Sequence, residues 1–361
     1  MRLEGIDTLR GLAVSFVIVY HFFAIFELYD NMLFKYIHAF GIFGVSLFFI
    51  ISGYLIYRSI DYNISKQGIK NGIKRYIIHR IFRIIPAYYF NLIIIFVLAL
   101  VMFETISTWS FGFMMKQILS HLTFTTFFID KITGFGINGA YWTLHVEMLW
   151  YILAVLMFIF IKKDRYLFVL FVLNIFYLMG LDYALFDSLF GLDEKSSNYI
   201  ILLYYWSFQI FGQLIYFIAG IFIYKHLKMN ITVSKLVAYL LFLLIISIFI
   251  YTSTQKYFIE SFTIKNIVTL LLTASLFILL HKHKMPEFDF LAWIGKISYS
   301  LYLWHLPLLY IVTKYSLASD MPLAISLGIY MVILLSISSL SYYFIEELGF
   351  RCRQKLENKY L

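Results

Sequence analysis

The sequence predicts an all-α, polytopic membrane protein. Of its 361 residues, 62% are hydrophobic and only 14% are charged, whereas soluble domains are about half apolar and about a quarter charged. The apolar runs are continuous over nearly twenty residues, which is the length of a membrane-spanning helix. They do not alternate with polar residues as the strands of a β-barrel would.

Ten of these runs are candidate membrane spans. They cover residues 9–26, 38–57, 86–103, 142–161, 166–181, 199–224, 235–252, 266–281, 297–315 and 323–345. The segment 110–128 is also apolar, but Lys116 and His121 interrupt it. We expect a re-entrant or interfacial helix there. The first run carries Arg10 and His21 and no small-residue cleavage pattern, so we interpret it as a retained helix and not as a signal peptide.

The basic residues predict the orientation. Ten spans place both termini on one side of the membrane, and a cytoplasmic N-terminus puts 22 of the 29 lysines and arginines in cytoplasmic segments. The same rule accounts for the net charge of +9, so no nucleic-acid partner is expected. We expect one transmembrane domain over residues 1–361, without an appended soluble domain, in the cytoplasmic (inner) membrane. The single cysteine, Cys352, excludes an internal disulfide.

The first span carries two ionisable residues, Arg10 and His21. They are eleven residues apart, so they share a helix face at a separation of about 16 Å along the axis. Ionisable groups in lipid are costly, and both are therefore expected to face the protein interior or a wet cavity as functional candidates. Alternatively, Arg10 extends to the membrane surface and His21 is a bonded core histidine.

The fourth span enters from the outside with His145 and Glu147, at a depth close to that of His21. A buried carboxylate needs a partner. An imidazole at matching depth is one candidate, and Glu147 would then fix its tautomer. A purely structural histidine–glutamate pair would give the same pattern.

The cytoplasmic segment before the third span carries Arg80 and Arg83, which share a helix face, with Arg75 and His79 nearby and Pro86 at the start of the span. Paired guanidinium groups at a membrane surface suit a phosphate or a diphosphate. The alternative is a topology signal or contact with anionic lipid head groups.

The remaining motifs favour structural roles. The small residues Gly44, Ser46, Ser52 and Gly53 predict close helix packing. His305 lies in the middle of the ninth span, before Pro307, and is expected to be structural or to support the site indirectly. His281 and His283 lie among lysines at the cytoplasmic surface. We expect no metal site.

Together these segments resemble the acyltransferase-3 family of bacterial membrane O-acyltransferases. The motifs that carry the resemblance are, in order, Gly5-Ile-Asp-Thr-Leu-Arg-Gly-Leu-Ala-Val with His21, Gly44-Val-Ser-Leu-Phe-Phe-Ile-Ile-Ser-Gly-Tyr-Leu, Arg80-Ile-Phe-Arg-Ile-Ile-Pro-Ala-Tyr, Tyr141-Trp-Thr-Leu-His-Val-Glu and Ile297-Ser-Tyr-Ser-Leu-Tyr-Leu-Trp-His. They extend over the whole chain.

The resemblance implies a ten-helix fold that takes an acyl group, most commonly acetyl, from cytoplasmic acyl-CoA. The implied acceptor is a hydroxyl of a surface or lipid-linked glycan at the outer face, and no permanently bound cofactor is implied. His21 matches the catalytic histidine that is proposed for the family, and Arg10 matches its essential partner. Arg80 and Arg83 match the pair tied to the donor, and Glu147 matches the acidic position of the fourth span.

Three features depart from the family pattern. Ser46 occupies a position that often holds Asp, and the last span ends in Phe344-Ile-Glu-Glu-Leu-Gly-Phe-Arg without the usual Glu-basic-Pro pattern. No extracytoplasmic SGNH-hydrolase domain follows, so we expect a stand-alone transferase.

Two mechanisms remain open, and so do three function classes: an enzyme, a transporter, and a membrane sensor or scaffold without turnover or CoA affinity. His21 would act as general base on the acceptor hydroxyl, oriented by Glu147, or an acyl-enzyme would form on His21 or a nearby serine. A transporter that exports a glycan or a lipid is the alternative function. The ionisable residues cluster near two depths and no inverted repeat is visible, which favours the enzyme.

Overall fold

The structure is a computed structural model. It describes residues 5–26, 32–102, 110–126, 137–161, 163–185, 199–227, 234–255, 261–282, 288–318 and 321–360. All regular secondary structure in these ranges is helical, so the predicted all-α class is confirmed for the described part of the chain. Eight helices in these ranges are long and apolar enough to cross a membrane. The number of ten spans and the cytoplasmic position of both termini stay predictions.

Each of the ten predicted spans lies on helical segments, to within a few residues at the ends. The two spans 38–57 and 86–103 share one long helical segment, α2 (Met32–Met102), which counts once among the eight. The ninth span coincides with α14 (Ser298–Ala318), which is not among the eight and carries polar residues that include His305 and Lys314.

The chain forms two compact units that alternate along the sequence. The first unit consists of Met1–Arg58 and Ile152–Lys296, and the second consists of Ser59–Tyr151 and Ile297–Leu361. Each unit is described below by itself. The single domain expected over residues 1–361 stays a prediction.

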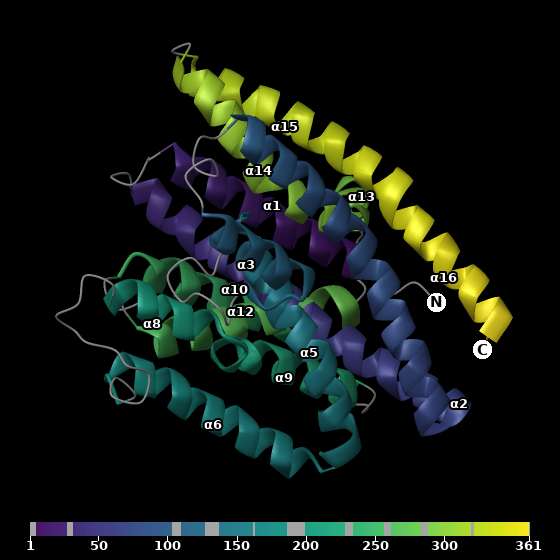
Figure 1. Ribbon diagram of the computed structural model, residues 1–361. Coiled ribbons are helices and arrows are strands. Elements are labelled where there is room, and N and C mark those ends of the chain that lie inside the picture. Colours follow the sequence, from purple (N-terminus) through teal and green to yellow (C-terminus); the bar gives the residue numbers. More distant parts are fainter. Residues whose placement is uncertain are drawn as a thin grey trace. The chain divides into compact units, whose positions relative to one another are not determined.

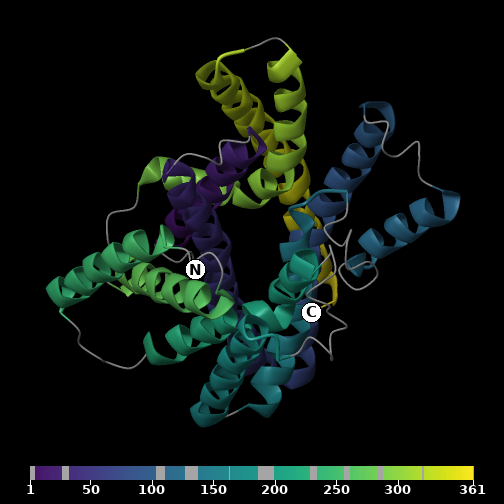
Figure 2. The ribbon, with the colours of Figure 1, turned by 90° about the vertical axis from the view of Figure 1, so that its left-hand side faces the viewer.

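The first unit contains the helix that carries Arg10 and His21. Its elements are α1 (Ile6–Ile25), the first part of α2, the end of α5 (Tyr141–Phe160), α6 (Asp164–Asp182), α8 (Tyr199–Phe208), α9 (Ile210–Leu227), α10 (Lys235–Ser253), α12 (Phe262–Lys282) and α13 (Asp289–Lys296). In Figure 2, α10 and α12 (green) lie side by side. A Cβ at Gly44 would lie 2.5 Å from the backbone oxygen of Ala13, and one at Gly53 would clash with the backbone of Phe217. The packing role predicted for these glycines is confirmed.

The short helix α13 lies within the segment 282–296, which was predicted to be cytoplasmic and without a helix. It packs against the start of α1 through two glycines. A Cβ at Gly11 would clash with the backbone of Leu291, and a Cβ at Gly295 would clash with the backbone of Asp7. Eight residues are too few to give a periodic signal, so only the tertiary contact reveals this helix.

The second unit contains the arginine-rich segment. Its elements are the rest of α2, α3 (Phe111–Leu122), the start of α5, α14, α15 (Leu323–Ser341), the π-helical turn η2 (Tyr342–Glu346) and α16 (Glu347–Tyr360). α14 and α15 pack as a hairpin, seen in yellow-green in Figure 2. Figure 1 shows α15, η2 and α16 following one another as one long rod.

Gly68 divides α2 into two arms. Its φ of 75° and ψ of 174° are non-helical, in a backbone region that is essentially restricted to glycine. A Cβ at Gly72 would lie 2.6 Å from Cα of Ile64, so the chain folds back on itself at this point. The spans 38–57 and 86–103 therefore lie on separate arms. The sequence suggested that a helix begins at Pro86, at the start of the third span. The structure places Pro86 inside the second arm, so this suggestion was wrong.

α3 accounts for the interrupted apolar segment 110–128. It has twelve residues, which gives a length of about 18 Å, too short to cross a bilayer. The Ser110 hydroxyl accepts a hydrogen bond from the backbone N–H of Phe113 at 3.3 Å and caps its start. A short, non-spanning helix was expected here, and its position relative to the membrane surface stays a prediction.

Candidate functional site

A cavity of about 370 Å³ lies in the second unit, between α2 and α16. It is lined by His79, Arg80, Arg83, Phe350, Arg353 and Gln354. Arg80 and Arg83 are the pair that the sequence nominated, and the structure places both at one cavity. Three guanidinium groups around one cavity are suited to phosphate, because each planar fork can bind two oxygens at once. We call this cavity the basic pocket.

Two tyrosines hold Arg80 in place. Cζ of Arg80 lies 5.5 Å from the centre of the Tyr76 ring and 5.6 Å from that of Tyr151. The Tyr76 hydroxyl donates a hydrogen bond to the backbone oxygen of Tyr151 at 3.1 Å, which holds the Tyr76 ring against α5. A guanidinium between two aromatic faces is stabilised without using its hydrogen-bond donors, so these remain for a ligand.

Glu147 lies in the same unit as the arginine pair. Its Oε1 accepts a hydrogen bond from the Tyr151 hydroxyl at 3.0 Å, one helical turn along α5. Tyr151 thus contacts both the carboxylate of Glu147 and the guanidinium of Arg80. His21 belongs to the other unit. The pairing of Glu147 with His21 stays a prediction.

Three lining residues were missed because they come from α16, the last helix of the chain. Residues 346–361 were expected to be a cytoplasmic segment, and no binding role was predicted for them. The spacing of Phe350, Arg353, Gln354 and Glu357 places them on one face of a helix, and this pattern could have suggested a ligand-binding or packing face.

Gly349 explains why α16 reaches the pocket. A Cβ at this position would lie 2.7 Å from the backbone oxygen of Phe82, which directly precedes Arg83 in the sequence. Without a Cβ, the backbone of α16 can approach this turn of α2. One turn further along, Arg353 then lines the same cavity as the arginine pair.

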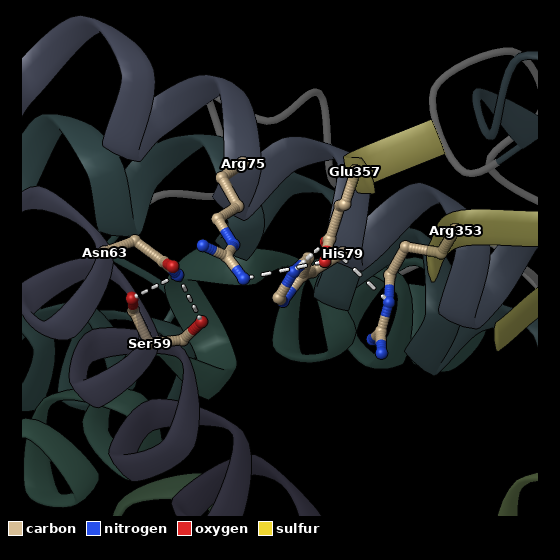
Figure 3. Close-up of polar contacts among 6 residues, drawn as sticks. All are labelled: Ser59, Asn63, Arg75, His79, Arg353 and Glu357. Carbon is tan, nitrogen blue, oxygen red and sulfur yellow. Dashed lines mark hydrogen bonds and ion pairs between the residues drawn. The ribbon is translucent and has the colours of Figure 1, made fainter. Parts of the chain in front are cut away.

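An acidic residue, Glu357, contacts three basic side chains beside the basic pocket. Figure 3 shows Glu357 of α16 between His79 and Arg75 of α2 and Arg353 of its own helix. Its carboxylate is 3.6 Å from Nη2 of Arg75 and 3.8 Å from Nε of Arg353, and it also pairs with Nε2 of His79. The Glu357 side chain is only 14% exposed. The contacts join α16 to α2 beside the basic pocket.

The first unit holds Arg10 and His21 on α1, as the sequence placed them. Arg10 forms an ion pair with Asp7 at 3.6 Å, one turn earlier, and its side chain is 17% exposed. Nδ1 of His21 lies 2.9 Å from the backbone oxygen of Val17. A carbonyl oxygen only accepts hydrogen bonds, so Nδ1 carries the proton and Nε2 keeps the lone pair in the neutral ring.

The other two candidate histidines are buried among polar groups of the second unit. His145 is 1% exposed, and its Nδ1 lies 2.5 Å from the hydroxyl of Thr126. Its ring centre lies 6.5 Å from that of His121, on α3. His305 is fully buried, and its Nδ1 donates a hydrogen bond to the backbone oxygen of Tyr302 at 2.7 Å. These contacts favour structural roles for both.

Within the described residues, no group of three or more histidine, cysteine, aspartate or glutamate side chains could hold a metal ion. The side chain of His281 and all of His283 lie outside the described part of the chain. The expectation about these two histidines therefore stays a prediction.

Comparison with known proteins shows the family of the chain. Residues 3–343 match the acyltransferase domain of the acyltransferase-3 family. The O-acetyltransferases OatA of Staphylococcus aureus strains NCTC 8325 and COL are each 26% identical to the chain over 369 residues. The alignment covers 95% of this chain and 56% of each relative, so the chain spans little more than half of their length. No solved structure matches the chain. The family match covers residues of both units, and it extends to the hairpin of α14 and α15. The chain therefore belongs to the acyltransferase-3 family of membrane O-acyltransferases.

Proposed function

We propose that this protein transfers an acyl group, expected to be acetyl, from cytoplasmic acyl-CoA to a hydroxyl of a cell-surface or lipid-linked glycan. The site of action would be the cytoplasmic membrane, with the acceptor at its outer face. Family membership and the O-acetyltransferase relatives support the reaction class. The observation that carries the donor assignment is the basic pocket, where Arg80 and Arg83 lie together at one cavity.

The donor would bind by its phosphates. CoA carries a diphosphate and a 3′-phosphate, and the guanidinium groups of Arg80 and Arg83 are suited to these groups by charge and by shape. Its pantetheine arm would extend into the membrane beside Arg10 and carry the thioester towards His21. Charged groups would thus stay at the cytoplasmic face, and only the uncharged arm would enter the bilayer.

His21 would act as general base through Nε2. The proton on Nδ1, directed to the Val17 carbonyl, leaves Nε2 as the basic atom. Nε2 would take the proton of the acceptor hydroxyl while the oxygen attacks the thioester carbonyl. The carbon–sulfur bond breaks, the thiolate leaves and takes up the proton, and the products are an ester and CoA. Glu147 would assist by stabilising, through its negative charge, the cationic ring that forms when Nε2 takes the proton.

Mass spectrometry of surface glycans tests the proposal. A strain that lacks this protein should lose glycan ester groups, and the wild-type gene should restore them. Purified protein in lipid nanodiscs should release CoA from acetyl-CoA when the glycan fraction is added. An unchanged ester content together with no CoA release would contradict the proposal and favour transport.

A further inference from the structure

α16 lies beyond the residues that match the family, yet it supplies half of the lining of the basic pocket. The match ends at residue 343, whereas Phe350, Arg353 and Gln354 line the cavity with His79, Arg80 and Arg83. Cζ of Arg353 also lies 5.8 Å from the centre of the Phe350 ring. These three lining residues are therefore features of this chain that the family match does not cover.

The two arginines of α16 have different surroundings. The side chain of Arg351 is 72% exposed and pairs with Glu347 at 3.7 Å, one turn earlier on the same helix. The side chain of Arg353 is only 24% exposed and lies at the cavity. An exposed pair of the first kind contributes little. Arg353 instead loses part of its hydration. A partly buried cation at the same cavity as Arg80 and Arg83 favours an anionic ligand.

Glu357 contacts Arg353 on one side of the guanidinium. The 3.8 Å contact is made by Nε, so the two terminal nitrogens of Arg353 are not engaged by this carboxylate. Glu357 is itself held from α2 by Arg75 and His79, as Figure 3 shows. The carboxylate therefore restricts the orientation of the Arg353 side chain and leaves its terminal nitrogens for a ligand.

We propose that Arg353 is a third phosphate-binding residue of the basic pocket and that Glu357 is its positioning residue. The identity of the ligand as acyl-CoA rests on the proposed function. CoA offers three phosphate groups, and the pocket offers three guanidinium groups, two from α2 and one from α16. The last helix of the chain thus becomes part of the donor site.

Calorimetric titration of CoA into the full-length protein in lipid nanodiscs tests the role of Arg353. Arg353→Gln should weaken CoA binding about tenfold, since a charge-assisted hydrogen bond to phosphate is lost. Arg353→Lys should recover part of this loss, because it keeps the charge without the planar fork. Arg351→Gln removes the same charge from the same helix and should change the affinity by less than about twofold. Thermal unfolding of each variant excludes a loss of fold as the cause.

A double-mutant cycle tests the role of Glu357. Glu357→Gln should weaken CoA binding by a few fold while Arg353 is present. In the Arg353→Gln background the same change should have almost no further effect, because the residue that Glu357 positions is gone. A carboxylate that merely fastens α16 to α2 would weaken binding equally in both backgrounds.

The outcomes separate this inference from the proposed function. If Arg353→Gln and Arg351→Gln bind CoA equally well, Arg353 has no binding role and the inference is wrong, while acyl transfer still stands. Inorganic diphosphate serves as a second probe in the same titrations. The affinity for diphosphate can depend on Arg353 while the wild-type protein releases no CoA from acetyl-CoA. In that case the inference stands and the proposed function fails.

Discussion

The Tyr151 hydroxyl donates a hydrogen bond to Oε1 of Glu147 at 3.0 Å, and the ring of the same tyrosine lies 5.6 Å from Cζ of Arg80. The acidic residue of the fourth span is thereby connected to the basic pocket within one unit. Because the hydrogen bond joins residues one turn apart on α5, it also fixes the direction in which the carboxylate points. Tyr151 can therefore be changed without removing any charge.

Tyr151→Phe should lower kcat/KM for acyl transfer about tenfold and leave the KM for acetyl-CoA nearly unchanged. The substitution removes a hydrogen bond to a charged group but keeps the ring that contacts Arg80. Steady-state kinetics of the purified protein would measure both constants. Tyr166→Phe, at an exposed tyrosine, is the control and should behave as wild type. An increase in the donor KM instead would mean that Tyr151 acts through Arg80.

His21→Ala should lower the turnover number by roughly a hundredfold to ten-thousandfold, which is the usual contribution of a general base. The protein should still be expressed and inserted, because Nδ1 of His21 bonds to the backbone oxygen of Val17 within its own helix. Release of CoA from acetyl-CoA in the presence of the glycan fraction would measure the loss. Tyr20→Phe serves as the control, since it keeps the aromatic ring beside His21. Turnover close to wild type in the His21 variant would remove it as the base.

The spans were predictable because each is a local property of its sequence. A run of apolar residues is read without knowing what it packs against, and the packing of Gly44 and Gly53 follows from residue size. The basic pocket was predictable only in part. Arg80 and Arg83 are one turn apart, so the sequence alone indicates that they form a pair. Arg353 lies far along the chain and reaches the same cavity only by tertiary packing.

The same limit applies to the histidines. His145 and Glu147 are two residues apart, so they point in different directions from α5, and their side chains contact different partners. His145 contacts Thr126, and Glu147 contacts Tyr151. His145 and Glu147 were proposed as site residues because their expected depth in the membrane matches that of His21. Depth alone does not determine which neighbour each helix face contacts.

Protein stability should fall between pH 7 and pH 5.5 in a way that depends on His121. Burial lowers the pKa of this group below its ordinary value near 6.5. Its Nδ1 donates a hydrogen bond to the backbone oxygen of Gln117 at 2.7 Å, and its Nε2 accepts one from the N–H of Ile137 at 3.3 Å, so the folded state holds the neutral ring. As the pH falls below 6.5, the unfolded state takes up the proton first, and the free energy of unfolding decreases.

Thermal unfolding of His121→Asn measures this contribution, because the asparagine amide can still donate to Gln117. Between pH 7.5 and pH 5.5 the wild-type Tm should fall by roughly 1–2 °C more than that of the variant. Histidines distant from His121 contribute equally in both proteins and cancel in the comparison, whereas His145, whose ring centre is 6.5 Å away, can respond to the substitution. Parallel Tm curves for the two proteins would show that His121 is not held neutral.

Gly349→Ala should destabilise the protein and weaken donor binding. Replacing glycine in a helix normally gains up to about 1 kcal/mol. Here the new Cβ would lie 2.7 Å from the backbone oxygen of Phe82 and 3.1 Å from Cγ of Pro86, and a backbone oxygen cannot move aside cheaply. Overpacking of this kind costs about 1–3 kcal/mol, so the steric effect should outweigh the gain.

Gly328→Ala on α15 is the matched control, because among the described residues no atom outside the nearby backbone of its own helix lies within 4 Å of the new Cβ. It should leave the Tm unchanged or raise it slightly, whereas Gly349→Ala should lower it. The Gly349 variant should also raise the Kd for CoA several-fold, since a displaced α16 moves Arg353 away from Arg80 and Arg83. Equal Tm and Kd values in both variants would show that the close contact at Phe82 does not hold α16 against the basic pocket.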